Sequence, residues 1–554
     1  MKKSIISIIL TLACTSMFAQ NLGDALTFGA NDYIGTARSL GMGGAMNAVG
    51  CDLGSIGINP AGSAVAGYSQ FVVSPGLSLS GSATSFILDP YSSPAGNFKN
   101  TRTRFKLPNI GYTMRMSGGD WAQSITFGFV LNSTYDFNYN HYGEGLNASS
   151  SKFAEMARAA DGISNSVLGS DKFYNDELSN NLWDVKLGYD LGLIGAYGDA
   201  NEGHYVGCTE SLADDGSRYV PGNLIQRSKI ITEGSKNDIL LNMAFNFSNN
   251  FYLGFNMGIP CFTYSTSERF SEIAQTAEDF PVRFTYEDGT IENTFFSDAT
   301  YQYNYTASGV GLYGKIGAIW LPFAGLRLGA AVQTPTVMGI DEAWVHSGSV
   351  SYVDKGVVSG RGEQGYYSYD YVTPWQADFG VAYTFGKVGL LSVDYTMLNY
   401  STARFSDDYG SDFDFTNSCM REFAGISHNL RVGLEFNVVP DFSVRAGYGF
   451  TTSAEKYYTD GVNNYYYTDY DEDYYLGRKQ LPLESKYVPD LRQSVSLGFG
   501  YNPAGSFFAD FAVRYTSLPS SVYQPYYDYD DLYSPVFETR RSLINAVLTL
   551  GWRF

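Results

Sequence analysis

Few side chains of this 554-residue chain stand at spacings that could support catalysis or metal binding. The histidines are far apart, and no two cysteines form a CxxC pair, which zinc sites and redox pairs commonly use. We therefore expect no enzymatic activity, no metal site and no cofactor. After export, four cysteines could pair in three ways, and the sequence does not choose among them. The residues concerned are His141, His204, His346 and His428, with Cys51, Cys208, Cys261 and Cys419.

A glycine-rich stretch at residues 34–64, IGTARSLGMGGAMNAVGCDLGSIGINPAGSA, raises the question of a phosphate-binding loop. Methionine replaces the third glycine of G-x-G-x-x-G, no strand precedes it, and no Gly-Lys-Ser/Thr follows. The small residues Gly41, Gly43 and Gly44 instead allow the backbone to approach another surface closely. The stretch therefore predicts close packing rather than nucleotide binding.

The same stretch ends on Asn59-Pro60-Ala61-Gly62. Proline disfavours helical geometry at the residue before it, so Asn59 and Pro60 mark the exit from the stretch towards the first strand.

Charged residues recur on the polar faces of predicted strands. Arg431, Glu435 and Arg445 share one predicted hairpin, and Arg514 follows on a later strand. The simpler interpretation is a ladder of paired charges across neighbouring strands. The alternative is a cationic site for a ligand carboxylate, with Arg431, Arg445 and Arg514 as the candidate binding residues.

Two segments, residues 457–475 and 523–533, are dense in Tyr and Asp. Oxygen ligands suit calcium, but the spacing lacks the D-x-[DN]-x-[DN]-G pattern, and sugar stacking on Tyr is equally unspecific. We interpret both as solvated acidic external loops, whose charge divalent cations could bridge to lipopolysaccharide. The net charge of −20 argues against a nucleic-acid partner.

The elements that must position these residues are strands. From about residue 68, apolar and polar residues alternate with period two, as they do on strands with one apolar face. Clear examples are Asn429–Val438, Phe442–Phe450 and Ser494–Tyr501. The polar faces mix small residues with charges, as a wet interior allows.

About fourteen strands are expected, and the connections between them alternate strictly between short and long. The strands are predicted near 68–80, 104–116, 122–137, 237–247, 251–266, 300–321, 324–338, 368–385, 388–405, 427–438, 441–458, 491–501, 506–516 and 543–554. An even strand count with short turns at one end and long loops at the other is typical of outer-membrane barrels. A soluble sandwich, the alternative, gives no reason for that rhythm. The fold class expected is an all-β transmembrane antiparallel barrel with both termini on the short-turn, periplasmic side.

The ends of the chain agree with export and membrane insertion. Residues 1–19 have a basic start, an apolar run and a small-residue exit, which predict a signal peptide cut after Ala19. A lipoprotein through Cys14 is the weaker alternative. The last ten residues, NAVLTLGWRF, resemble the terminal strand read by the barrel-assembly machinery.

We expect a hatch at residues 20–66 and the barrel at 67–554, with a long external loop at 138–236 that contains helical segments near 151–163 and 175–193. A barrel of this width has a lumen that side chains alone do not fill, so the hatch is expected to plug it.

The stretch TARSLGMGGAMNAVGCDLGSIGINPAG resembles the N-terminal hatch of the FadL/TodX family of outer-membrane transporters, in its Bacteroidetes version. Asn59, Pro60 and Ala61 match the family's NPA motif, and Gly41, Gly43 and Gly44 fall in its glycine-rich part. The resemblance implies a monomeric, fourteen-stranded barrel in a Gram-negative outer membrane, plugged by the hatch. It also implies a lateral opening at an inward kink of the third strand, for which Gly128 and Asn132 are the candidates here. The family's ligand-binding residues do not transfer.

The function expected from the resemblance is passive uptake of a hydrophobic or amphipathic small molecule, such as a long-chain fatty acid or an aromatic compound. A scaffold or shuttle barrel of a type IX-like secretion system, binding protein partners at its loops, is the alternative. A TonB-dependent receptor is disfavoured because such barrels have about twenty-two strands.

Overall fold

The computed structural model describes residues 22–88, 94–170, 182–198, 203–285, 290–459, 464–465, 484–526 and 535–554. The predicted signal peptide at 1–19 and most of both Tyr- and Asp-rich segments lie outside these ranges.

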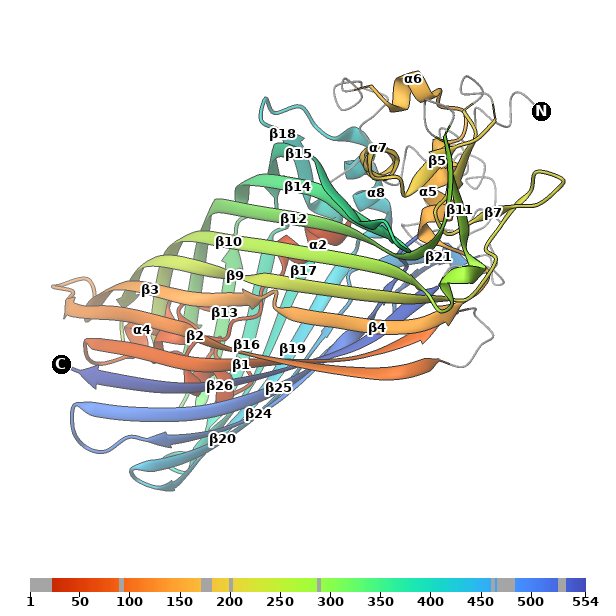
Figure 1. Ribbon diagram of the computed structural model, residues 1–554. Helices are drawn as coiled ribbons and strands as arrows, with labels where there is room; N and C mark the ends of the chain where they lie inside the picture. The colour runs from red at the N-terminus through yellow and green to blue at the C-terminus, as the bar shows by residue number, and fades with distance from the viewer. Residues whose placement is uncertain are drawn as a thin grey trace.

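The strands close into one antiparallel barrel of fourteen positions, which confirms the predicted fold class (Figure 1). The barrel closes where the first strand pairs with the last, at Gln70 opposite Arg553. Two positions are each built from two strands, because β12 pairs with both β13 and β14, which in turn pair with β16 and β15. The wall strands are β1 (Gln70–Ile87), β2 (Ala95–Ser117), β3 (Ser124–Asp136), β9 (Leu224–Asn246), β10 (Phe251–Ala274), β12 (Ile291–Trp320), β13 (Leu326–Gln333), β14 (Val337–Tyr352), β15 (Gly356–Val372), β16 (Gln376–Thr384), β17 (Gly389–Asn399), β19 (Ile426–Val439), β20 (Phe442–Thr452), β24 (Leu491–Tyr501), β25 (Phe507–Tyr523) and β26 (Val536–Arg553).

The wall is apolar outside and polar inside. Phe379, Phe499 and Phe511 are 51%, 58% and 44% exposed on the outer face, while Asp378 and Asp510 are buried on the inner face. Further aromatic side chains stand exposed near the short turns: Trp121, Trp320, Phe323, Phe385, Phe442 and Phe554. An outward apolar band bordered by aromatic residues is the surface that a lipid bilayer requires of a barrel.

Several wall strands extend further away from the short-turn end of the barrel than the alternation of apolar and polar residues predicted. β1 continues to Ile87 and β10 to Ala274, where the predicted strands end near 80 and 266. β12 begins at Ile291, nine residues before its predicted start near 300. Both faces of these extensions carry polar residues, so period two does not show in the sequence there.

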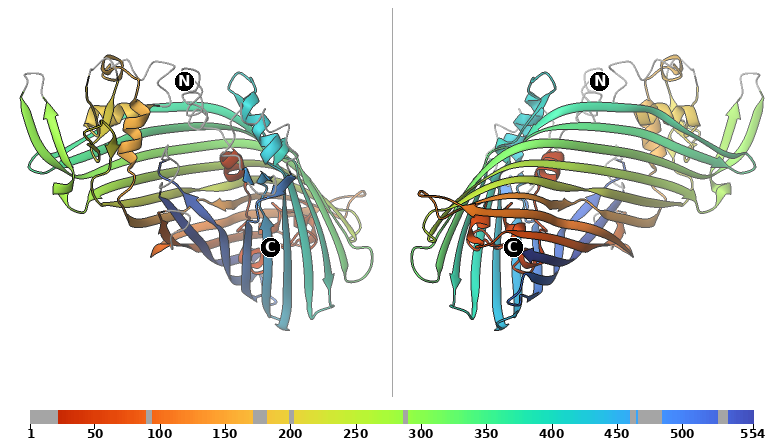
Figure 2. Two further views of the ribbon diagram at one scale, coloured as in Figure 1. Left: turned by 90° about the vertical axis from the view of Figure 1, so that its right-hand side faces the viewer. Right: turned by 90° about the vertical axis from the view of Figure 1, so that its left-hand side faces the viewer.

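The end of the barrel opposite the C-terminus carries a cap (Figures 1 and 2). The cap packs around an apolar cluster that includes Phe153, Leu193, Tyr205 and Phe296. Its elements are α5 (Lys152–Ala160), α6 (Asn165–Leu168), α7 (Trp183–Leu191), β5 (Ile194–Ala196), β6 (Tyr205–Gly207), β7 (Ser211–Leu212), β8 (Arg218–Tyr219), η3 (Ala277–Asp279) and β11 (Pro281–Thr285). The predicted helix at 151–163 corresponds to α5, and the part of the predicted 175–193 helix that is described forms α7.

The remaining elements lie on or inside the wall. Outside the N-terminal segment they are β4 (Tyr139–Asn147), η4 (Tyr400–Thr402), β18 (Arg404–Asp407), α8 (Asp414–Phe423), β21 (Lys456–Thr459), β22 (Asn464–Tyr465) and β23 (Glu484–Tyr487). No helix among the described residues is both long and apolar enough to cross a bilayer.

Candidate binding site in the barrel interior

The N-terminal segment, residues 22–66, runs inside the barrel as short helices joined by turns. These are α2 (Leu22–Gly29), α3 (Ala37–Gly41), η1 (Leu53–Ser55) and α4 (Gly62–Val65). Figures 1 and 2 show α2 surrounded by wall strands, and α3 contacts β20, β24, β25 and β26. Short helices of this kind have little stability of their own, so packing against the wall must hold them.

Glycines on both partners bring the segment against the wall. Gly43 has φ +66°, and a Cβ there would lie 3.1 Å from the backbone nitrogen of Tyr448. In return, a Cβ on Gly447 of β20 would collide with the backbone of Gly43, and one on Gly433 of β19 would lie 2.5 Å from the carbonyl oxygen of Met42. Likewise, a Cβ on Gly41 would lie 3.2 Å from the Gly498 Cα. The two surfaces therefore meet backbone to backbone.

Asn59 connects the segment to itself and to the wall. Its side-chain amide nitrogen donates to the Asn47 carbonyl at 2.9 Å and to the Ala318 carbonyl of β12 at 3.1 Å. Its oxygen accepts from the backbone N–H of Ala61 at 3.1 Å, and the Pro60 carbonyl accepts from Asn242 of β9 at 3.0 Å. Because all of these groups are buried, each missing partner would leave an unsatisfied polar atom.

Arg445 is a member of a chain of ion pairs. Glu435, directly across from it on β19, accepts from the Arg445 Nε at 2.6 Å and from the Nε of Arg38 at 2.9 Å. The Arg445 Nη1 lies 2.5 Å from Asp510. This arrangement matches the paired-ladder interpretation, and it also binds the N-terminal segment through Arg38.

Arg514 and Arg431 lie in another part of the interior, beside a small cavity of about 20 Å³. Arg514 binds both oxygens of Asp32, at 3.0 and 2.6 Å, and Arg492 of β24 binds the same carboxylate. Arg431 donates to the Gly44 carbonyl at 3.3 Å and has no ion pair within the described part of the chain. Asp32 is thus the one carboxylate in the lining of this cavity.

The structure brings two of the three candidate arginines together and separates the third. It adds Arg492 and Asp32, which sequence reasoning did not single out. Arg492 could have been found, since it shares the inward parity of Ser494 and Ser496 on one strand. Asp32 could not, because it lies in an irregular segment without periodicity.

Next to the arginines lies an aromatic chamber, which sequence reasoning also missed. Phe28 of α2 stacks on Phe262 with ring centroids 4.7 Å apart, and it meets Tyr264 edge-on at 5.7 Å. The chamber's other buried members are Ala25, Phe137, Ala307, Met338, Ile340, Tyr369, Tyr371, Ala403, Phe405 and Met420. Half of this apolar lining lies on the wall strands β10, β12, β14 and β15, and α2, α8, β18 and the chain beside them supply the rest.

The wall changes at the third strand, near one of the two candidate kink positions. Backbone pairing between β2 and β3 runs from Ser117–Ser124 to Asn109–Asn132 and ends there, and β3 is irregular between Ser133 and Tyr135. Gly128 lies within the regular pairing, between Thr113 and Asn242. The strand therefore departs from its neighbour at Asn132 rather than at Gly128.

Beyond Asn132 the chain turns inwards. Among the described strands β4 pairs only with β9, and a Cβ on Gly143 of β4 would press against Thr84 of β1 and Phe537 of β26. Side chains alone connect β2 with the inner strands here: Lys106 lies 2.5 Å from Asp136, and Arg102 and Arg104 both bind Glu233. We call this stretch of wall without backbone pairing the seam.

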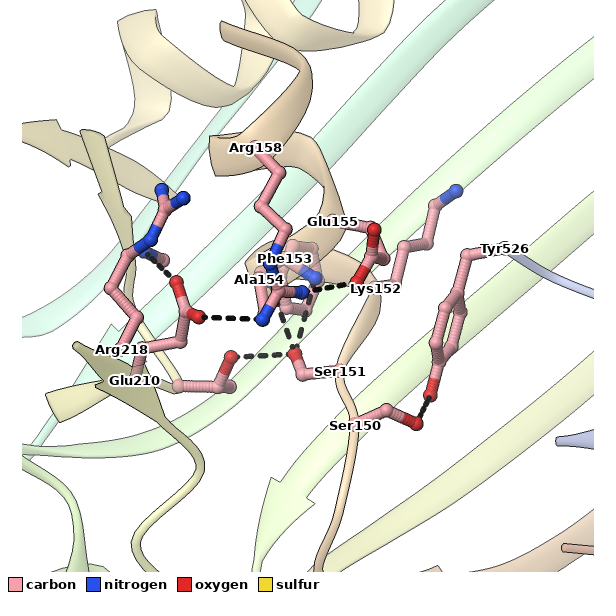
Figure 3. Close-up of polar contacts among 12 residues, drawn as sticks. Ser150, Ser151, Lys152, Phe153, Ala154, Glu155, Arg158, Glu210, Arg218 and Tyr526 are labelled. Atoms are coloured by element: carbon pink, nitrogen blue, oxygen red, sulfur yellow. Dashed lines mark hydrogen bonds and ion pairs between the residues drawn. The ribbon is translucent and has the colours of Figure 1, made fainter. Parts of the chain in front are cut away.

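Polar contacts attach the cap to the wall (Figure 3). Ser151, which caps α5, and Arg158, which binds Glu155 and Glu210, lie close together, and Tyr526 contacts Ser150 at 3.1 Å.

Glu272 lies on the extension of β10 beyond its predicted end near 266, where it contacts the start of α5. It accepts from the backbone N–H of Lys152 at 2.9 Å and from the Ser151 hydroxyl. Burial raises the pKa of Glu272 to about 7.

The histidines and cysteines do not gather at any site. His141 is buried between Thr539 and Ser228, while His346 and His428 hydrogen bond to tyrosines. Cys51, Cys208 and Cys261 form no disulfide within the described part of the chain.

Comparison with solved structures finds similarity over nearly the whole chain. A Pseudomonas aeruginosa FadL homologue has a TM-score of 0.47 and 11% identity, over 94% of this chain and 99% of that chain. The P. putida toluene transporter TodX has a TM-score of 0.43 and 13% identity, over 93% and 97%. The CymD monoaromatic hydrocarbon channel has a TM-score of 0.43 and 10% identity, over 94% and 97%. No protein-family model and no curated protein matches. The strand pairing itself carries the assignment: this chain is a closed fourteen-stranded barrel, apolar outside and polar inside, with its N-terminal segment in the interior.

Proposed function

We propose that this chain is an outer-membrane channel for the passive uptake of hydrophobic or amphipathic small molecules, with residues 20–66 as its hatch. The observation that carries the proposal is the aromatic chamber around Phe28, inside a wall whose outer face suits lipid. An apolar ligand gains free energy when it leaves water and packs against aromatic rings. Without α2, the chamber would offer that surface to a ligand.

The seam is the proposed lateral exit. Transfer of a hydrophobic ligand into water costs free energy. A route that takes the ligand from the chamber into the bilayer without crossing water must pass through the wall. Paired strands resist opening because every backbone hydrogen bond would be exposed to lipid. The seam beyond Asn132 has no such bonds between β2 and its neighbour, and ion pairs such as Lys106–Asp136 hold it closed.

The remaining expectations follow from this proposal. The short turns and both termini would face the periplasm, and the cap would face outwards among lipopolysaccharide. The protein would act as a monomer, inserted by the barrel-assembly machinery.

Two measurements test the proposal. Native mass spectrometry of the detergent-purified protein should reveal a co-purifying hydrophobic molecule. Proteoliposomes with the full chain should take up a hydrophobic probe such as toluene or oleate, and deletion of residues 20–64 should change that rate. If no ligand is found and the deletion leaves uptake unchanged, the channel proposal fails. A protein-export defect in the deletion strain would then favour the secretion-scaffold alternative.

A further inference from the structure

Residues 22–32 place two kinds of chemistry in two neighbouring parts of the lumen. Phe28 occupies the aromatic chamber, stacked on Phe262. Four residues later, Asp32 places its carboxylate between Arg492 and Arg514. Residues 22–32 therefore place an aromatic side chain in the apolar chamber and a carboxylate between the arginines of the wall.

The wall around this piece is unusually cationic for the chain. Acidic residues outnumber basic ones by 56 to 36 overall, yet the lining of the cavity holds three arginines, Arg431, Arg492 and Arg514, and one carboxylate, that of Asp32. Among the described residues, the Nε of Arg514 has no hydrogen-bond partner. If Asp32 left, Arg492 and Arg514 would lose the ion-pair partner that they share in a largely buried site, which is strongly unfavourable.

A fourth cation also faces the segment. The Lys236 ammonium donates to the carbonyls of Phe28 at 2.8 Å and Ala30 at 3.3 Å. Asp238, the acidic residue nearest to Lys236 along β9, is bound by the hydroxyl of Tyr313 at 2.7 Å. The contacts of Lys236 with the segment are thus to backbone carbonyls, which a ligand's oxygen atoms could replace.

We infer that residues 22–32 are a tethered stand-in for the cargo, and that the cargo is an amphipathic monocarboxylate with a ring-bearing apolar part. This inference rests on the proposed function. The cargo displaces the segment by supplying the two things that the segment supplies: apolar surface in the chamber and a carboxylate for Arg492 and Arg514. A neutral molecule supplies only the first and leaves the arginines unpaired.

The tether explains how the site stays closed without cargo. A segment attached a few residues away competes at an effective concentration of about millimolar. Charge-assisted, bidentate binding of a carboxylate by arginine is stronger than a neutral hydrogen bond, so Asp32 carries much of the competition. Removing the charge of Asp32 should weaken the competition of the segment with an acidic ligand. The arginines are then free to bind the carboxylate of that ligand.

Binding of a matched pair of probes tests the inference. Phe28 and Asp32 are separated by at most roughly 14 Å of extended chain, so labelled 8-phenyloctanoate and 8-phenyl-1-octanol are suitable lengths. Binding is measured on the full chain in nanodiscs, with empty nanodiscs subtracted. The variants are Asp32→Ala and Asp32→Asn, and the control Asp441→Asn removes the same charge from the exposed turn between β19 and β20.

Asp32→Ala should tighten binding of the acid at least about tenfold and that of the alcohol less than about threefold. Asp32→Asn should act in the same direction, which covers the case in which the alanine variant folds poorly. Adding Arg514→Gln to Asp32→Ala should abolish the gain, and Asp441→Asn should leave both affinities within about twofold.

Equal gains for acid and alcohol, or a loss for the acid, would overturn the inference while leaving the channel proposal intact as long as the probes are still taken up. If neither probe binds to any variant and neither is taken up, both proposals fail.

Discussion

Arg514 of β25 binds both carboxylate oxygens of Asp32, at 3.0 and 2.6 Å, although the two residues are 482 positions apart in the chain. The pair lies beside two backbone hydrogen bonds between the segment and β3, from Asp32 N–H to the Thr134 carbonyl and from Ile34 N–H to the Ser133 carbonyl. This is the point at which the N-terminal segment, the arginine cavity and the start of the seam meet.

Replacing Arg514 by Gln should loosen this point without unfolding the barrel. The Arg514 side chain is 4% exposed, so its removal breaks a largely buried pair and should cost about 2–3 kcal/mol of local stability. Amide exchange at residues 30–36 should accelerate by roughly thirtyfold or more, measured by mass spectrometry. Arg514→Lys, which keeps the charge but not the two-point geometry, should fall between. Unchanged exchange in Arg514→Gln would contradict the anchoring role of the pair.

The glycine contacts predict an effect from a single methyl group. Gly447→Ala places a Cβ into the backbone of Gly43, so the segment must shift or leave. We expect the variant to leak, with higher single-channel conductance than the wild type. Gly314→Ala is the matched control, because the nearest atom to its new Cβ is 3.9 Å away. Equal conductance in the two variants would show that close backbone packing does not seal the lumen.

The cap should loosen as pH rises through neutrality. An unfolded Glu carboxyl titrates near 4.5, and burial raises the pKa of Glu272 to about 7. The folded cap therefore holds the proton more tightly, and this contribution to stability is full below pH 4.5, declines up to about pH 7 and is lost above it. The ¹⁹F signal of fluorinated Trp183, in α7 of the cap, reports the change.

Glu272→Gln is the test variant, because the amide stays neutral and still offers one acceptor oxygen to the start of α5. Its cap should be more stable than the wild-type cap at pH 8, and the difference should vanish near pH 4. A wild-type cap whose ¹⁹F signal is constant from pH 4 to 8 would refute this account of Glu272.

The seam should open when the ion pairs between its side chains are removed. The double variant Lys106→Ala with Asp136→Ala removes the ion pair without leaving a buried charge, so the barrel should still fold. Amides at residues 133–138 should then exchange faster, while those at 124–131, paired on both sides, should not change. A uniform increase along the whole of β3 would mean that the seam is not a separate unit.

The wall could be predicted from the sequence because each strand carries its own evidence. Strands such as β20 and β24 show one apolar and one polar face, and the bilayer enforces that pattern all round the barrel. The same parity placed Arg431, Arg445 and Arg514 correctly in the interior. The extensions of the strands beyond the apolar band were hidden because both of their faces carry polar residues.

The binding site could not be predicted in the same way. Whether an inward arginine pairs with the wall, as Arg445 does, or with the N-terminal segment, as Arg514 does, depends on contacts between residues hundreds of positions apart. Phe28 and Asp32 lie in irregular or short elements, for which sequence periodicity gives no signal.

A disulfide that locks the N-terminal segment tests the central claim most directly. A Cβ on Gly41 would lie 3.5 Å from the Cβ of Ala512 on β25, within the range that disulfides span. Gly41→Cys with Ala512→Cys is placed in a background in which Cys51, Cys208, Cys261 and Cys419 are replaced by Ser, and uptake of a hydrophobic probe is measured before and after reduction. The account predicts that the oxidised protein transports at a small fraction of the reduced rate, and that reduction restores transport. Equal uptake in the two states would contradict gating by the N-terminal segment.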